Sequence, residues 1–171
     1  MPDLVDLLIE DDRWKVLPLE TLGEKAARAA FAALALPSDG FELTLLACSD
    51  HRIALLNEEF RAKAQPTNVL SWPSDERGAE QPGGKPLKPQ PGSLDDPESL
   101  GDVAIAWETV EREAAEGGIP LPDHTTHLII HAVLHLLGYD HEDDRDAELM
   151  EALEVKALAS MGLPDPYARA S

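Results

Sequence analysis

The chain has 171 residues, 43% of them apolar, and a formal net charge of −19 from 33 acidic and 14 basic residues. Its length suits one domain with a real core, and no apolar run approaches the roughly 18 residues needed to cross a membrane. The negative charge argues against indiscriminate binding to nucleic acid or anionic membranes. A polyanionic ligand would need a local positive site, and Arg52, Arg61 and Lys63 lie in a short stretch that is nearer to charge balance.

The predicted elements of the first half alternate between strands and helices. In chain order they are a strand over 3–11, a helix over 18–36, a strand over 41–49, a helix over 51–63 and a strand over 67–73. The acidic N-terminus lacks the basic start and uninterrupted apolar segment of a secretory signal, so we expect a cytoplasmic protein. The single cysteine, Cys48, excludes an internal disulfide framework and is expected to be a buried core residue.

Residues 74–99 interrupt this alternation. They are dense in Pro and Gly and almost free of apolar residues, which predicts a flexible surface insertion within a single domain spanning 1–171. A mobile loop without a function of its own is the simpler interpretation of this segment. The remaining predicted elements are a strand over 100–107, a helix over 108–118, a helix over 123–137 and a helix over 146–162.

The chain places four of its six histidines close together, at His127, His131, His135 and His141. In the predicted helix 123–137, His131 and His135 are four residues apart, on one face and roughly 6 Å of rise from each other. Gly138 ends that helix and lets the chain reverse sharply, so His141 can return toward the same face. Three imidazoles can therefore converge.

Three converging imidazoles would suit a zinc ion with a fourth position left for water, which is the pattern of catalytic sites. Zinc lowers the pKa of bound water to about 7 and polarises phosphoryl or carbonyl oxygens, so hydrolysis is the natural use. The alternative is that these histidines are only polar members of an amphipathic helix. The apolar residues between them weaken that alternative, because they place the helix in the core, where unpaired imidazoles are costly. A zincin-type HExxH site is excluded, because Ala132 stands where the glutamate would be.

The histidine segment HAVLHLLGYDH (131–141) resembles the HGxLHLxGYDH signature of the YbeY family, bacterial zinc-dependent endoribonucleases of ribosomal RNA maturation and ribosome quality control. The segments LNEEFRAKAQPTNVLSWP (56–73) and LGDVAIAWETVEREA (100–114) are similar to further stretches of that family. EDDRDAELMEALE (142–154) is similar to the acidic helix that follows the family's histidines. The resemblance covers about residues 50–166 apart from the insertion. Ala132, Asn68 and Trp72 depart from the family's usual Gly, Asp and Phe, and Asn68 lacks the aspartate's charge.

The resemblance implies that His131, His135 and His141 hold one zinc ion and that Arg61 is the functional arginine. The chemistry of Arg61 agrees, since a planar, permanently charged guanidinium can hold a scissile phosphate in two hydrogen bonds. Its alternative is a solvated residue on a helix surface. Asp140 is expected to orient a ligand imidazole, to cap the next helix or to be a solvated residue of the turn. His127 is not counted among the ligands, and its role stays open.

We therefore expect a single compact α+β domain, with a central mixed sheet of about four strands, surrounding helices and a histidine helix lining a metal cleft. The expected function is a zinc-dependent endoribonuclease for single-stranded RNA in ribosomal RNA processing and ribosome quality control. Metal-bound water would attack the phosphodiester while Arg61 binds the phosphate. Expected partners are single-stranded and ribosomal RNA and the ribosome or its small subunit, with neither membrane nor DNA. Two alternatives stay open: a metal-dependent hydrolase of peptide or amide bonds, and a non-catalytic ribosome assembly factor with structural zinc.

Overall fold

A four-stranded sheet runs through the centre of the computed structural model, which describes residues 3–61, 67–75, 77–79 and 81–167, without the side chains of residues 60 and 61. Its strands are β1 (Val5–Ile9), β2 (Phe41–Cys48), β3 (Val69–Pro73) and β4 (Glu98–Ala106). Their order across the sheet is β1-β2-β4-β3. β1, β2 and β4 are parallel, whereas β3 pairs antiparallel with β4 and forms one edge. The predicted mixed sheet of about four strands is confirmed.

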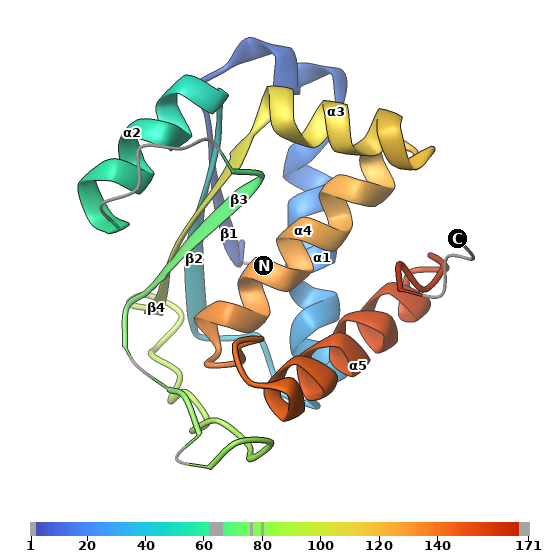
Figure 1. Ribbon diagram of the computed structural model, residues 1–171. Coiled ribbons are helices and arrows are strands. Elements are labelled where there is room, and N and C mark those ends of the chain that lie inside the picture. Colours follow the sequence, from blue (N-terminus) through green and yellow to red (C-terminus); the bar gives the residue numbers. More distant parts are fainter. Residues whose placement is uncertain (1–2, 62–66, 76, 80, 168–171) are drawn as a thin grey trace.

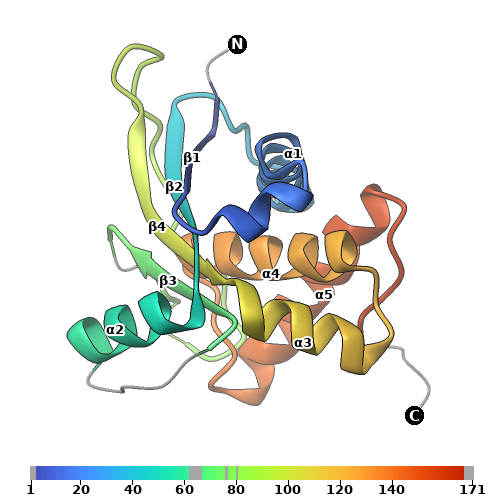
Figure 2. The same cartoon turned by 90° about the horizontal axis from the view of Figure 1, so that it is seen from above.

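Five α-helices in the described part of the chain surround this sheet (Figures 1 and 2). They are α1 (Leu19–Ala33), α2 (Asp50–Arg61), α3 (Trp107–Gly117), α4 (Leu121–Leu136) and α5 (Asp144–Ser160). α1, α4 and α5 gather on one side of the sheet, with α4 in contact with both other helices and with β3. No helix among the described residues combines the length and the apolar character that a membrane span requires.

The two faces of the sheet bury different clusters of side chains because neighbouring strand residues point in opposite directions. In β4, Val103 and Ile105 join the main core, whereas Ala104 and Ala106 join a smaller cluster with Ile53 of α2. The main core also contains the apolar residues of α4 (Leu128, Ile129, Ile130, Ala132, Val133, Leu134 and Leu136). The prediction that the histidine helix lies in the core is therefore confirmed. Cys48 is also buried, as predicted.

Several predicted boundaries were wrong, although each predicted element exists. The predicted helix 18–36 ends at Ala33, because the next residues form a turn in which Ala35 has a positive φ of 56°. Trp107, predicted to end a strand, begins α3, where its ring packs edge-on against Trp14 with centroids 5.1 Å apart. Residues Asp12–Val16 form a short 3-10 helix, η1, that was not predicted. Its Trp14 donates an indole hydrogen bond to the Cys48 carbonyl, so a tertiary contact holds this turn in place.

The helix that carries the histidines also begins earlier than predicted. It was expected from residue 123, but α4 starts at Leu121, with Pro122 in its first turn. A proline fits there because the first backbone N–H groups of a helix have no partner within the helix. The predicted stop at Gly138 is close to the observed end at Leu136.

The segment predicted as an insertion, 74–99, makes defined contacts with the histidine helix. Its last two residues belong to β4. The guanidinium of Arg77, only 6% exposed, donates a 3.0 Å hydrogen bond to the carbonyl of Leu136 at the end of α4. The backbone N–H of Gly83 donates to the Asp146 carboxylate at the start of α5. These contacts attach the segment to both ends of the turn between α4 and α5, whereas its flexibility stays a prediction.

Candidate metal centre

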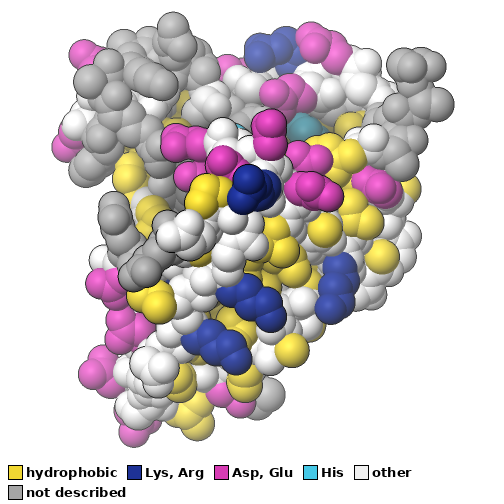
Figure 3. Space-filling model, turned by 60° about the horizontal axis from the view of Figure 1, so that its bottom comes forward, with side chains coloured by type: hydrophobic (Ala, Val, Ile, Leu, Met, Phe, Trp, Pro, Cys, Tyr) yellow, Lys and Arg dark blue, Asp and Glu magenta, His cyan; other side chains and the backbone are white. Residues whose placement is uncertain are grey.

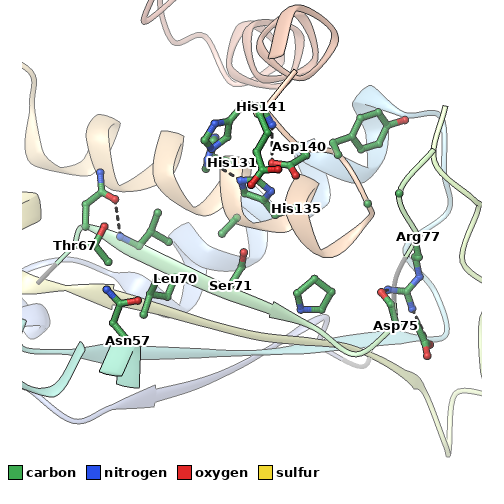
Figure 4. Close-up of a pocket in the computed structure, with 18 residues that line it drawn as sticks. Asn57, Thr67, Leu70, Ser71, Asp75, Arg77, His131, His135, Asp140 and His141 are labelled. Carbon is green, nitrogen blue, oxygen red and sulfur yellow. Dashed lines mark hydrogen bonds and ion pairs between the residues drawn. The ribbon is translucent and has the colours of Figure 1, made fainter. Parts of the chain in front are cut away.

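The three predicted ligands come together at one end of α4. One ligand nitrogen from each of His131, His135 and His141 lies within 4.8 Å of the other two. The Nε2 atoms of His131 and His135 are 3.1 Å apart, and the His141 ring centroid is 5.2 Å from each of the other two centroids. Figure 4 shows the three rings directed toward one another above β3. The structure thus brings together all three residues that the sequence singled out as ligands.

Local structure explains this convergence. His131 and His135 are one turn apart on α4, so they share a face. Gly138 then adopts a positive φ of 101°, which few residues other than glycine tolerate, and turns the chain back toward that face. A Cβ at this position would lie 2.7 Å from the carbonyl oxygen of Arg77, so the turn is also too crowded for a side chain. The backbone N–H of His141 donates to the Asp140 carboxylate, which steadies the turn that carries the third ligand.

The donor set fits a zinc ion. Two imidazole nitrogens bound to zinc at about 2.0–2.1 Å with a tetrahedral angle would be about 3.3 Å apart, close to the 3.1 Å observed between His131 and His135. Burial, together with the neighbouring imidazoles, lowers the pKa of His135 to about 4. That imidazole is therefore neutral at physiological pH, which is the form that coordinates a metal.

A buried carboxylate stands behind the first ligand. Glu154 of α5 is 1% exposed, and one of its oxygens accepts a 3.1 Å hydrogen bond from Nδ1 of His131. The other oxygen accepts hydrogen bonds from Nε2 of His127 and from the Tyr167 hydroxyl. Burial by itself would raise the pKa of Glu154, but the hydrogen bonds that its oxygens accept outweigh burial and lower the pKa to about 2.

Sequence reasoning did not single out Glu154. One signal was present, since Met150, Glu154, Ala157 and Leu158 are the buried residues of α5 and share the spacing of one helix face. An acidic residue in an apolar stripe needs a partner inside the protein. Its partners could not be named, because His131 is 23 residues away in the chain.

An open cleft of about 940 Å³ lies over the three histidines. The edge strand β3 forms one wall of the cleft, and the C-terminal end of α4 with its following turn forms another (Figure 4). Three acidic residues, Asp75, Asp140 and Glu142, line it, and Figure 3 shows acidic side chains around the visible histidine atoms. Among the described lining residues, Arg77 is the one cation, and its guanidinium is engaged by the Leu136 carbonyl.

The other residues named from the sequence have different positions. Arg61 is the last residue of α2, but its side chain lies outside the described residues, as does all of Lys63. Arg52 does not line the cleft; its Nε atom is 3.3 Å from the Glu10 carboxylate. Asn68 lines the cleft, but its side-chain amide donates to Glu113.

The fold and the site define a class of protein: a mixed α+β protein whose open cleft contains three histidines placed to bind a metal ion. The chain belongs to the YbeY family, since the family model described as "Endoribonuclease YbeY" matches residues 9–162.

Relatives with the same description resemble nearly the whole chain. The protein from Cereibacter sphaeroides is 58% identical over 98% of this chain and 100% of its own length. The Jannaschia protein is 52% identical over 95% of this chain and 99% of its own. A solution structure of a Thermotoga maritima protein has a TM-score of 0.54 and 23% identity, covering 96% of this chain and 99% of that chain. This last likeness concerns the fold alone.

Proposed function

We propose that this protein is a zinc-dependent endoribonuclease that cuts single-stranded RNA. The observation that carries the proposal is the convergence of His131, His135 and His141 in an open cleft, in a chain of the YbeY family. The three imidazoles would hold one zinc ion per chain. Bound there, zinc would supply Lewis acidity toward a phosphoryl oxygen and would acidify a water molecule to act as nucleophile.

Arg61 is the residue that we propose to bind the scissile phosphate. Asn57 of α2 lines the cleft, and Arg61 is the last residue of the same helix. A guanidinium can make paired hydrogen bonds to a phosphate and offset the negative charge that grows in the transition state. The acidic lining of the cleft makes such a cation necessary, because Asp75, Asp140 and Glu142 repel the RNA backbone.

The proposed substrate is ribosomal RNA presented as a single strand by the ribosome or its small subunit. A net charge of −19 opposes long-range capture of free RNA, so a partner that presents the strand would raise the rate of cleavage. This role places the protein in ribosomal RNA maturation and ribosome quality control, in the cytoplasm, with no membrane or DNA partner. We also propose that residues 1–171 act as one metal-dependent hydrolase domain.

The direct test is elemental analysis of freshly purified protein, combined with RNA cleavage assays before and after chelation. We expect about one zinc per chain, cleavage of single-stranded RNA, loss of activity with chelator and recovery when zinc is restored. A zinc-loaded protein that cleaves no RNA, free or ribosome-bound, would instead support a binding role in assembly. Cleavage of peptides by the same site would contradict the proposed substrate.

A further inference from the structure

The carboxylate of Glu154 is buried against the back of the metal centre and holds three hydrogen-bond donors. His127 and Tyr167 both donate to Oε1, the tyrosine at 2.6 Å, whereas His131 is the one residue in the described part of the chain that donates to Oε2. No lysine or arginine in the described part of the chain forms an ion pair with this carboxylate. A buried carboxylate with only imidazole and hydroxyl partners is costly, unless positive charge is supplied nearby.

The hydrogen bond from His131 determines which ring nitrogen faces the cleft. An ionised carboxylate only accepts hydrogen bonds, so the Nδ1 atom of His131 must carry the proton. The lone pair of a neutral His131 ring is then on Nε2, the atom that lies 3.1 Å from Nε2 of His135. A metal bound to Nε2 would share the ring with Glu154, and its positive charge would compensate the buried carboxylate.

The residues around Oε1 keep this arrangement in place. The rings of His127 and Tyr167 meet nearly at right angles, with centroids 5.7 Å apart, and both direct their donors at Oε1. Because Oε1 already has two donors, Oε2 stays with His131. Tyr167 comes from the C-terminal end of the described chain, so that segment contributes to the support of the site.

We propose that Glu154 is a positioning residue of the metal centre: it holds His131 in the tautomer and orientation that present Nε2 to the metal ion. His127 and Tyr167 support it by occupying the other carboxylate oxygen. The inference rests on the proposed function only in requiring that the three histidines bind zinc. It adds a residue from α5 that touches the ligand and not the metal.

The test compares Glu154→Gln with Glu148→Gln, a matched control at an exposed position of the same helix. Zinc affinity is measured by competition with a chromophoric chelator, which requires no RNA cleavage. We expect Glu154→Gln to bind zinc roughly 10- to 100-fold more weakly than the wild type, because partners behind a ligand histidine have effects of this size. Glu148→Gln should bind as the wild type does.

A second measurement reports on His131 itself. Nitrogen-15 NMR of the imidazoles in the zinc-free protein should show the proton of wild-type His131 on Nδ1. In Glu154→Gln, the amide oxygen is expected to stay with the two donors at Oε1, so the amide NH₂ would face His131. The Nδ1 atom must then accept, and the proton moves to Nε2, where it competes with zinc and weakens binding. A purely structural role of Glu154 would leave this tautomer unchanged.

The outcomes separate the inference from the function on which it rests. If the wild type binds zinc and Glu154→Gln matches it in affinity and tautomer, the positioning role is overturned while the metal centre stands. If the wild type binds no zinc, the proposed function fails and the inference fails with it. Should Glu154→Gln not fold, Tyr167→Phe removes one donor and leaves the carboxylate in place. We expect that variant to lose roughly 2- to 10-fold in zinc affinity, the value of one hydrogen bond, and unchanged affinity would count against the proposal.

Discussion

His135 is the most informative single residue of the candidate metal centre, because its ring centroid is 4.6 Å from that of His131 and 5.2 Å from that of His141, and burial is the chief cause of its lowered pKa. We predict that His135→Ala loses most of its zinc, since removing one of three ligands leaves a weak two-ligand site. Elemental analysis after gel filtration measures the loss. His51→Ala, at an exposed position on α2, is the control and should keep about one zinc per chain. Full zinc content in both His131→Ala and His135→Ala would refute the assignment.

Arg61 allows phosphate binding to be separated from metal binding. We predict that Arg61→Ala keeps its zinc and its stability but cleaves RNA on the order of 100-fold more slowly, because one preorganised charge at a developing anion contributes about 3 kcal/mol. The rate is measured with a fluorescent single-stranded RNA under single-turnover conditions. Arg52→Ala, which removes a cation that pairs with Glu10, serves as the control and should retain activity. If Arg61→Ala cleaves RNA at the wild-type rate, Arg61 does not bind the scissile phosphate and is only a solvated residue of the helix.

At the scale of elements, the turn between α4 and α5 links the ligands to the rest of the fold. It carries His141, and Arg77 packs its carbonyl oxygen against Gly138. The segment 74–99 is therefore not only a surface loop, since its Arg77 packs against the turn that positions His141. A substitution in this turn should therefore weaken metal binding, even though it alters none of the three histidines.

Gly138→Ala tests this link, with Gly118→Ala as its control. Both glycines have positive φ, 101° and 63°, so alanine costs about 1 kcal/mol or more at either position. A Cβ at Gly118 meets no atom within 4 Å, whereas one at Gly138 would lie 2.7 Å from the Arg77 carbonyl oxygen. We predict that both variants unfold at lower urea concentration and that only Gly138→Ala also loses zinc affinity, by roughly 10-fold or more. Equal zinc affinity in the two variants would show that the turn does not position His141.

For the whole molecule, the net charge of −19 and the acidic residues that line the cleft oppose the binding of RNA. We predict weak binding to free RNA with a shallow salt dependence, equivalent to roughly two or three phosphate contacts. Single strands should bind better than a matched duplex, because a flexible backbone can enter the cleft and a rigid helix cannot. Fluorescence anisotropy from low to physiological salt measures both properties. Tight duplex binding with a steep salt slope would contradict a local site.

Because the net charge of −19 opposes capture of free RNA, we predict faster cleavage of a ribosomal strand presented by ribosomal particles than of the identical RNA free in solution. The comparison uses equal concentrations of one cleavage site in the two forms. Equal rates would remove the need for a presenting partner.

The sequence by itself determined which three histidines converge, because their geometry is local: two histidines one helical turn apart, and a third after a glycine that reverses the chain. Apolar periodicity in the sequence also determined the succession of strands and helices along the chain. Only the tertiary structure decided which groups meet the ligands from elsewhere. Glu154 and Arg77 are 23 and 59 residues away from the atoms that they contact on α4. Such pairings depend on how the helices and the insertion pack against one another. Residue spacing and apolar periodicity within one element do not specify that packing.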